Sequence, residues 1–187
     1  MGRDISKTKA KKDRMEYPIA YLITFTTYGT WLHGDKRGSV DKEHNRYGDA
    51  FIAAKSALKT EERIDLKNPP VKLSSIQRKK VLKAILEVCK FRGWFAYSVH
   101  VRSNHVHVVV SANTRPEKAM VDFKRYATRI LKGTGGTNKI RKYWTRHGST
   151  RYIWTRRRLS AVIAYVKEGQ GKPMAVGTMQ NKQSPEC

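Results

Sequence analysis

Acidic residues are scarce in this chain. Its 187 residues include 15 Asp and Glu against 39 Lys and Arg, which gives a formal net charge of +24. Self-repulsion at this level opposes compaction and favours a polyanionic partner. Because the basic residues are spread through the sequence rather than confined to one tail, nucleic acid is the first candidate for that partner. The alternative is a basic surface that serves solubility alone.

Cysteines and long apolar runs are also few. The two cysteines, Cys89 and Cys187, lie far apart, so neither a disulfide framework nor a cysteine zinc site is expected. No apolar run approaches the roughly 20 residues that a membrane-spanning helix needs, and the charged N-terminal residues do not resemble a secretory signal. We therefore expect a cytoplasmic, nucleoid-associated protein that has no membrane partner.

The length and the 39% of hydrophobic residues fit one domain with extensions. Residues 1–16 are polar and charged, and we expect them to form a flexible basic arm. The domain itself is predicted over 17–172, and a polar, irregular stretch at 36–72 is predicted to be an insertion within it. After this domain, residues 173–187 are expected to form a loose tail.

Hydrophobic periodicity predicts three helices and a set of strands. The helices are expected at 75–91, 116–132 and 159–168, and the strands at 17–27, 94–102 and 105–111, with short strand-like pieces at 143–144 and 152–154. A strand-helix-strand unit repeated around a central hairpin is the ferredoxin-like split βαβ plan. We therefore expect an α+β sandwich in which the helices cover one face of an antiparallel central sheet and the other face is open.

Two histidines stand two positions apart on the predicted strand 105–111. Side chains alternate between the faces of a strand, so His105 and His107 project together, roughly 7 Å apart, while Val106 and Val108 take the opposite face. Two imidazoles on a rigid strand can supply two ligands to one divalent metal ion. Since two ligands do not complete a coordination shell, a pair of solvent-facing histidines is the alternative.

Basic and aromatic residues are interleaved between 139 and 158. Aromatic rings stack on unpaired bases while arginine and lysine hold phosphates; the alternative is that the tryptophans belong to the core. On the predicted helix 116–132, three further basic residues share a face. The candidate DNA-binding residues are therefore Arg125, Arg129, Lys132, Arg141, Lys142, Trp144, Tyr152, Arg156, Arg157 and Arg158.

The order of these motifs resembles the single-tyrosine HUH transposases of small insertion sequences and of repetitive-extragenic-palindrome elements. The marks of that family are His-hydrophobic-His on a strand, matched by His105-Val106-His107, and a tyrosine on a late helix, matched by Tyr165. The stretches 28–31 (YGTW) and 151–154 (RYIW) are also similar to sequences of the family. The resemblance covers about residues 17–172.

The resemblance implies that Tyr165 attacks a DNA phosphate, which yields a 5′-phosphotyrosine link and a free 3′-OH. A magnesium or manganese ion on His105 and His107 would polarise that phosphate. The substrates implied are single-stranded DNA hairpins, and the enzyme is either a monomer or a homodimer that shares its active sites between subunits. Without the resemblance, Tyr165 would be interpreted as a core residue, because it lies among valines and isoleucine at 162–166.

The resemblance also implies a third, polar metal ligand about one helical turn after Tyr165. Gly169 stands there, and glycine has no ligand atom. Gln170 is a candidate if the helix loosens at Gly169. Glu168 is the other candidate, because it shares a face with Tyr165 and carries a carboxylate, which suits Mg²⁺ or Mn²⁺.

Two other functions fit the same residues. One is a non-catalytic, domesticated DNA-binding protein that keeps the basic surface. The other is an HUH nickase of the replication-initiator or relaxase type, which the short length and the lack of a helicase or mobilisation segment disfavour.

Overall fold

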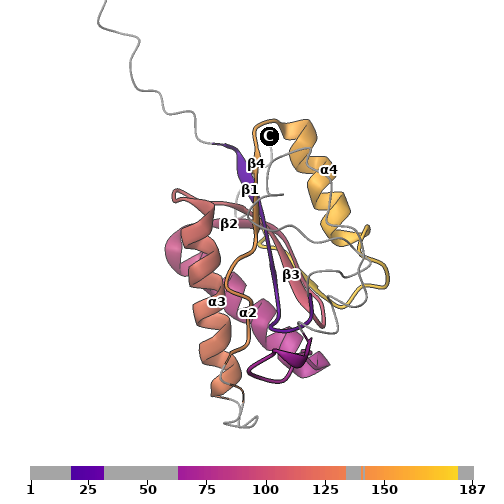
Figure 1. Cartoon of the computed structure of the whole chain (residues 1–187). Helices are drawn as coiled ribbons and strands as arrows, with labels where there is room; N and C mark the ends of the chain where they lie inside the picture. The colour runs from indigo at the N-terminus through magenta and orange to yellow at the C-terminus, as the bar shows by residue number, and fades with distance from the viewer. Residues whose placement is uncertain (1–17, 32–62, 134–139, 141, 181–187) are drawn as a thin grey trace, which may run out of the picture.

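The computed structural model describes residues 18–31, 63–133, 140 and 142–180 (Figure 1). The predicted basic arm, most of the predicted insertion at 36–72 and the candidate DNA-binding residue Arg141 lie outside these residues.

Five strands form one antiparallel sheet in the order β4-β1-β3-β2-β5. They are β1 (Ala20–Thr26), β2 (Phe95–Val101), β3 (His105–Ser111), β4 (Ser149–Ile153) and β5 (Ala175–Gly177). The strand with the histidine pair, β3, is central, because it lies between β1 and β2. Val and aromatic residues give these strands their β propensity. The predicted α+β class with an antiparallel, ferredoxin-like sheet is confirmed.

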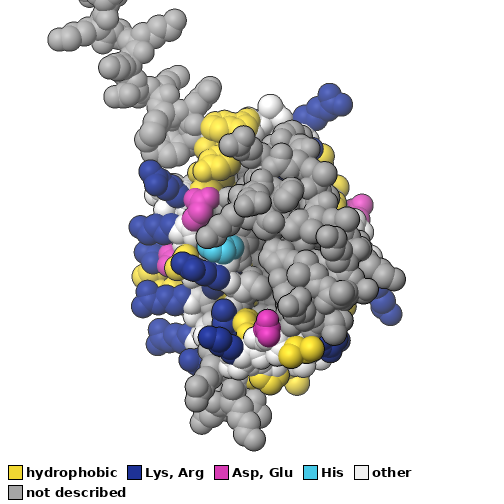
Figure 2. Space-filling model, viewed as in Figure 1, with side chains coloured by type: hydrophobic (Ala, Val, Ile, Leu, Met, Phe, Trp, Pro, Cys, Tyr) yellow, Lys and Arg dark blue, Asp and Glu magenta, His cyan; other side chains and the backbone are white. Residues whose placement is uncertain are grey.

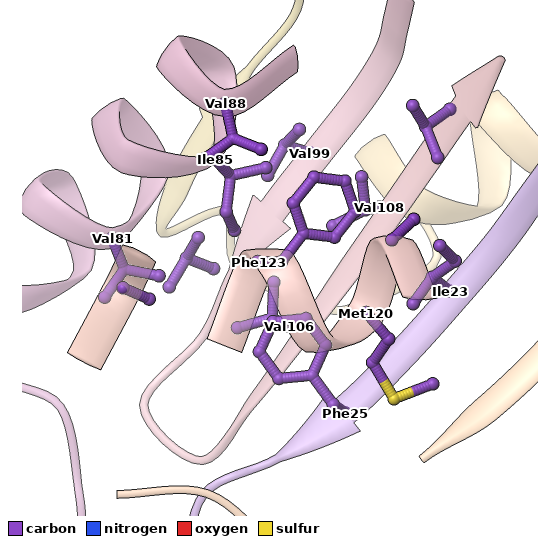
Figure 3. Packing of buried hydrophobic residues seen from close by; sticks show 14 of the residues in the cluster. Ile23, Phe25, Val81, Ile85, Val88, Val99, Val106, Val108, Met120 and Phe123 are labelled. Atoms are coloured by element: carbon purple, nitrogen blue, oxygen red, sulfur yellow. The ribbon is translucent and has the colours of Figure 1, made fainter. Parts of the chain in front are cut away.

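Two helices, α2 (Ser75–Arg92) and α3 (Pro116–Lys132), pack on one face of the sheet (Figure 1). Helix α2 begins at a capping box: Ser74 Oγ accepts from the Gln77 N–H, and Gln77 Oε1 accepts from the Ser74 N–H. It ends at Gly93, whose φ of 68° lies in the left-handed region that glycine adopts readily. Figure 3 shows apolar side chains of both helices meeting Phe25 and valines of the strands.

The third helix, α4 (Arg156–Lys167), lies on the opposite face of the sheet (Figure 1). Its buried residues Val162 and Val166 pack with Leu22 of β1 and Val109 of β3. The prediction put the helices on one face and left the other open. The structure keeps α2 and α3 together, and α4 covers the β2–β3 half of the second face, because that face also carries apolar side chains that need burial.

The C-terminal boundary differs from the prediction. Residues 173–187 were expected to be a loose tail, but Ala175–Gly177 form β5, which pairs with the outer edge of β2. Three residues are too few for periodicity to signal a strand, and pairing covers an edge that would otherwise be exposed. Helix α4 also begins three residues earlier than predicted, because Thr155 accepts from the Arg158 N–H as its N-cap. None of the described helices is long and apolar enough to span a membrane.

Candidate functional site

The two histidines of β3 project together on the face of the sheet that α4 partly covers. Their ring centroids are 4.8 Å apart. His107 is 7% exposed and His105 is partly buried. The pair therefore lies at the boundary between the covered and the open part of this face.

Neighbouring side chains hold both imidazole rings in place. His105 Nδ1 donates to Asn104 Oδ1 at 2.8 Å, which puts the lone pair of this ring on Nε2. His107 Nδ1 lies 2.7 Å from Oγ1 of Thr24, its register partner on β1. A threonine hydroxyl can donate or accept, so Thr24 can hold His107 in either tautomer. Hydrogen bonds of this kind orient metal-ligating histidines.

The chain after α4 brings a third polar group to the pair. Gln170 Oε1 lies 3.2 Å from His107 Nε2. Among the described residues no three His, Cys, Asp or Glu side chains form a metal-binding group. Glu168 is exposed at the C-cap of α4 and does not complete such a group. Of the two predicted third ligands, Gln170 is therefore the one that lies beside the histidines.

Gly169 has no ligand atom of its own, but it allows Gln170 to lie beside His107. Its N–H donates to the Tyr165 carbonyl at 2.9 Å. A Cβ at position 169 would lie 2.8 Å from the Tyr165 carbonyl oxygen and 2.9 Å from Cδ2 of the Tyr165 ring. Any larger residue would displace the tyrosine or the turn, and glycine lets the chain pass close to Tyr165 before it reaches His107.

Tyr165 is exposed on α4 although its neighbours in sequence are apolar. Half of its side chain is exposed to solvent, at 50%. Its ring centroid lies 6.0 Å from that of His107. Val162 and Val166 take the buried face of the helix instead. The phenol is therefore accessible from outside and lies next to the histidine pair.

A third histidine, His100, ties the surrounding elements together. It is fully buried on β2 directly opposite His107 in the β2–β3 register. Its Nδ1 donates to the Val166 carbonyl at 2.9 Å, and its Nε2 accepts from the Met174 N–H at 3.3 Å. Burial lowers the pKa of His100, so the ring is neutral and can accept this bond. It thus holds both ends of the segment that carries Gln170.

Sequence reasoning missed Thr24, and it put His100 on the strand beside the histidine pair without a role in the site. A short connection at Ser103-Asn104 fixes the β2–β3 register, and this register puts His100 opposite His107. Thr24 depends on the pairing of β1 with β3, between strands about 80 residues apart, and no local pattern signals it.

A protein-family model described as "Transposase IS200 like" matches residues 71–168, just over half of the chain. The chain belongs to this transposase family. It is the single-tyrosine HUH group that the sequence resembles. The matched residues include the histidine pair and Tyr165, whereas Gln170 lies beyond them.

Two solved structures are similar to this transposase in arrangement. One, a REP-associated tyrosine transposase bound to a REP hairpin, has 10% identity and a TM-score of 0.46, over 86% of this chain and 72% of that chain. The other, a candidate transposase from Deinococcus radiodurans R1, has 10% identity and a TM-score of 0.42, over 84% of this chain and 95% of that chain. A comparison with curated proteins found no match.

One aromatic residue predicted to bind DNA belongs to the core of the transposase. Trp144 is buried, packs edge-to-face on Phe25 and donates its indole N–H to Thr128 Oγ1. The prediction that Trp144 stacks on bases is therefore wrong, because its bridge to Thr27 at the end of β1 draws it inward. Tyr152 is exposed and stacks on Trp154, with ring planes 14° apart.

The described basic residues that were predicted to bind DNA are exposed, and they are divided between the two faces of the sheet. Arg125, Arg129 and Lys132 lie on α3, on the side opposite the histidine pair, where Figure 2 shows a column of Lys and Arg side chains. Tyr152 also points to this side, since it packs edge-to-face against Tyr21. On the other side, Arg156, Arg157 and Arg158 form the exposed first turn of the helix that carries Tyr165. Lys142 is exposed above the Tyr28 ring.

Burial holds His107 of this transposase in the neutral form that a metal ligand needs. It lowers the pKa of His107 from its ordinary 6.5 to about 4, and the nearby charge of His105 acts in the same direction. The hydrogen bond that His107 donates to the amide oxygen of Gln170 opposes this shift. A neutral imidazole keeps a lone pair available at physiological pH.

The lowered pKa predicts a pH-dependent stability of the metal-free protein. The pKa of His107 is 6.5 in the unfolded chain and about 4 in the folded protein. The unfolded chain therefore binds more protons between these pH values, so stability is lost as pH falls through this window. The contribution is up to about 3 kcal/mol. Urea unfolding in EDTA at pH 7.5 and pH 4 should show a smaller loss for His107→Gln than for the wild-type protein. Equal losses would contradict the prediction.

Proposed function

We propose that this transposase cleaves and rejoins single-stranded DNA at hairpin or palindromic element ends, with Tyr165 as the nucleophile. His105, His107 and Gln170 would hold a divalent metal ion. The observation that carries the proposal is the position of His107, which contacts Gln170 at 3.2 Å and faces the Tyr165 ring at 6.0 Å between centroids. The proposed nucleophile therefore lies close to the proposed metal donors.

The donor set fits a divalent ion. Two imidazole rings and an amide oxygen combine ligands of transition metals with the oxygen that Mg²⁺ and Mn²⁺ prefer, and the mixture favours Mn²⁺ over Mg²⁺. When bound, such an ion supplies Lewis-acid polarisation of the phosphate and stabilises charge on the leaving oxygen. The neutral state of His107 and the hydrogen bonds of both rings prepare these side chains for that role.

The chemical step uses the exposed phenol of Tyr165. Its oxygen attacks the phosphorus and loses its proton, the bond from phosphorus to the 3′ oxygen breaks, and the released 3′ oxygen takes up a proton. The product is a 5′-phosphotyrosine. Because the phosphoester bond energy is retained, attack by another 3′-OH rejoins a strand without nucleotide hydrolysis.

The arrangement supports a site completed within one chain. Tyr165 faces His107 of its own chain, and the α4 arginines lie on the same helix as this tyrosine. This favours a nucleophile and metal donors from one subunit over a homodimer that exchanges them between subunits.

A covalent adduct assay tests the proposal. Single-stranded hairpin oligonucleotides are incubated with the protein and Mn²⁺ and separated on a denaturing gel, with EDTA as the control. We expect a metal-dependent protein–DNA adduct and, with a second 3′-OH strand, a joined product. Binding without an adduct on any of these hairpins would indicate a non-catalytic DNA-binding protein. An adduct without joining would indicate a nickase.

A further inference from the structure

A positively charged cavity opens beside the candidate site. It has a volume of about 390 Å³ and lies between the start of α2 and the segment that follows Gln170. Among the described residues that line it, four are basic, Arg78, Lys79, Arg102 and Lys172, and none is acidic. Four like charges around one hollow repel one another, and an anion bound there relieves this repulsion.

The two arginines are fixed in place and keep donors for a ligand. Arg78 donates one N–H to the Leu73 carbonyl at 2.9 Å, and Arg102 donates one to the Lys172 carbonyl at 3.1 Å. A guanidinium has five N–H donors, so each keeps several. Within the described residues neither arginine forms an ion pair with a carboxylate. Fixed guanidinium groups are well suited to phosphate oxygens.

The start of α2 adds to the positive potential of this cavity. Ser75, the first residue of the helix, lines it, and the first turn contains no acidic residue. The positive end of a helix dipole favours an anion at this position. The lining residues that the structure describes include no aromatic side chain on which a base could stack, so the cavity suits a phosphate rather than a nucleobase.

The cavity is adjacent to the proposed metal donors. Lys172 follows Gln170 by two residues, and Arg102 precedes the Ser103-Asn104 turn that leads to His105. The Leu73 N–H donates to the Ser103 carbonyl at 2.7 Å, which fastens the chain before α2 to this turn. A single DNA strand with one phosphate near the histidines would therefore have another phosphate, a few nucleotides away, at the cavity.

The geometry points to a second phosphate-binding site: the Arg78–Lys79–Arg102–Lys172 cavity binds a backbone phosphodiester of the single strand near the scissile position. This rests on the proposed function for the identity of the strand. By fixing one phosphate, the cavity sets which neighbouring phosphate Tyr165 reaches.

Replacing single DNA phosphates with uncharged groups tests this site by DNA binding alone, independently of cleavage. In a series of hairpin oligonucleotides, each phosphate in turn is replaced by an uncharged methylphosphonate, and affinity is measured by fluorescence anisotropy in EDTA. We expect one position near the cleavage site to weaken binding several-fold in the wild-type protein. In the double variant Lys79→Gln/Lys172→Gln that position should have a smaller effect, because only the two arginines remain, and the slope of log affinity against log salt should become shallower by up to about 0.7.

The matched control removes two exposed lysines outside the cavity, Lys90→Gln/Lys118→Gln. It makes the same change in net charge and should leave the methylphosphonate profile unchanged. A double variant at Lys79 and Lys172 that keeps the wild-type profile would overturn the inference, as would a wild-type profile with no sensitive position. Because binding is measured in EDTA, a sensitive position in a protein that forms no covalent adduct would refute the proposed function and support the cavity.

Discussion

Replacing Tyr165 with phenylalanine should abolish the covalent protein–DNA adduct and leave the fold intact. The phenol oxygen is the proposed attacking atom, and phenylalanine lacks only this oxygen. Loss of a nucleophile typically costs several orders of magnitude in rate, so we expect adduct below about one thousandth of the wild-type amount. The side chain is half exposed and its hydroxyl is not buried in the core, so the thermal unfolding midpoint should hardly move.

Tyr152→Phe is the matched control for this variant. Tyr152 is 49% exposed against 50% for Tyr165, but it lies on the other face of the sheet, against Tyr21. The same removal of one hydroxyl should leave adduct formation unchanged, because phenylalanine keeps the aromatic ring with which Tyr152 was predicted to stack on bases. Adduct that persists in Tyr165→Phe would show that another residue is the nucleophile, and equal losses in both variants would show that the assay reports DNA binding instead.

Removing the His107 imidazole should abolish metal-dependent cleavage, with a loss of about a thousandfold or more for His107→Ala. Charge stabilisation by a bound ion accounts for several kcal/mol of the barrier, which corresponds to this factor. Gln170→Ala should weaken Mn²⁺ binding as well, because Gln170 Oε1 lies beside His107 Nε2. Calorimetric titration with Mn²⁺ in the absence of DNA measures the affinity independently of cleavage.

Two substitutions serve as controls for the metal donors. Glu168→Gln removes the carboxylate of the other predicted ligand, which is exposed at the C-cap of α4, and should leave Mn²⁺ affinity unchanged. His147→Gln removes an exposed histidine in the chain before β4 and should also have no effect. Loss of Mn²⁺ binding in Glu168→Gln with normal binding in Gln170→Ala would reverse the assignment of the third ligand.

The local elements could largely be predicted from the sequence. Helix α3 spans 116–132 in the structure, as predicted, because Pro116 favours the first helical position and the apolar residues follow helical spacing. The strand that carries His105 and His107 also keeps its predicted bounds, 105–111. These features are decided by neighbours within a few residues, and the family resemblance added the identity of Tyr165 as a candidate nucleophile.

The sequence left two candidates for the proposed third ligand, Gln170, which the family resemblance favoured, and Glu168. Glu168 shares a helical face with Tyr165, and this favours it only if the helix continues. The helix ends at Lys167, and the turn at Gly169 brings Gln170 to His107 instead. The choice depends on the close approach of the chain to the Tyr165 ring, which is a three-dimensional contact.

Composition and periodicity were enough to establish the charge, the main helices and strands, and the common face of His105 and His107. The rest of the site depends on how distant segments pack. Tertiary packing buried Trp144 in the core, placed α4 on the second apolar face of the sheet, and set Thr24 and His100 on either side of His107. The reason is that periodicity records only local alternation, whereas strand register and helix placement depend on pairing and burial between segments far apart in the chain.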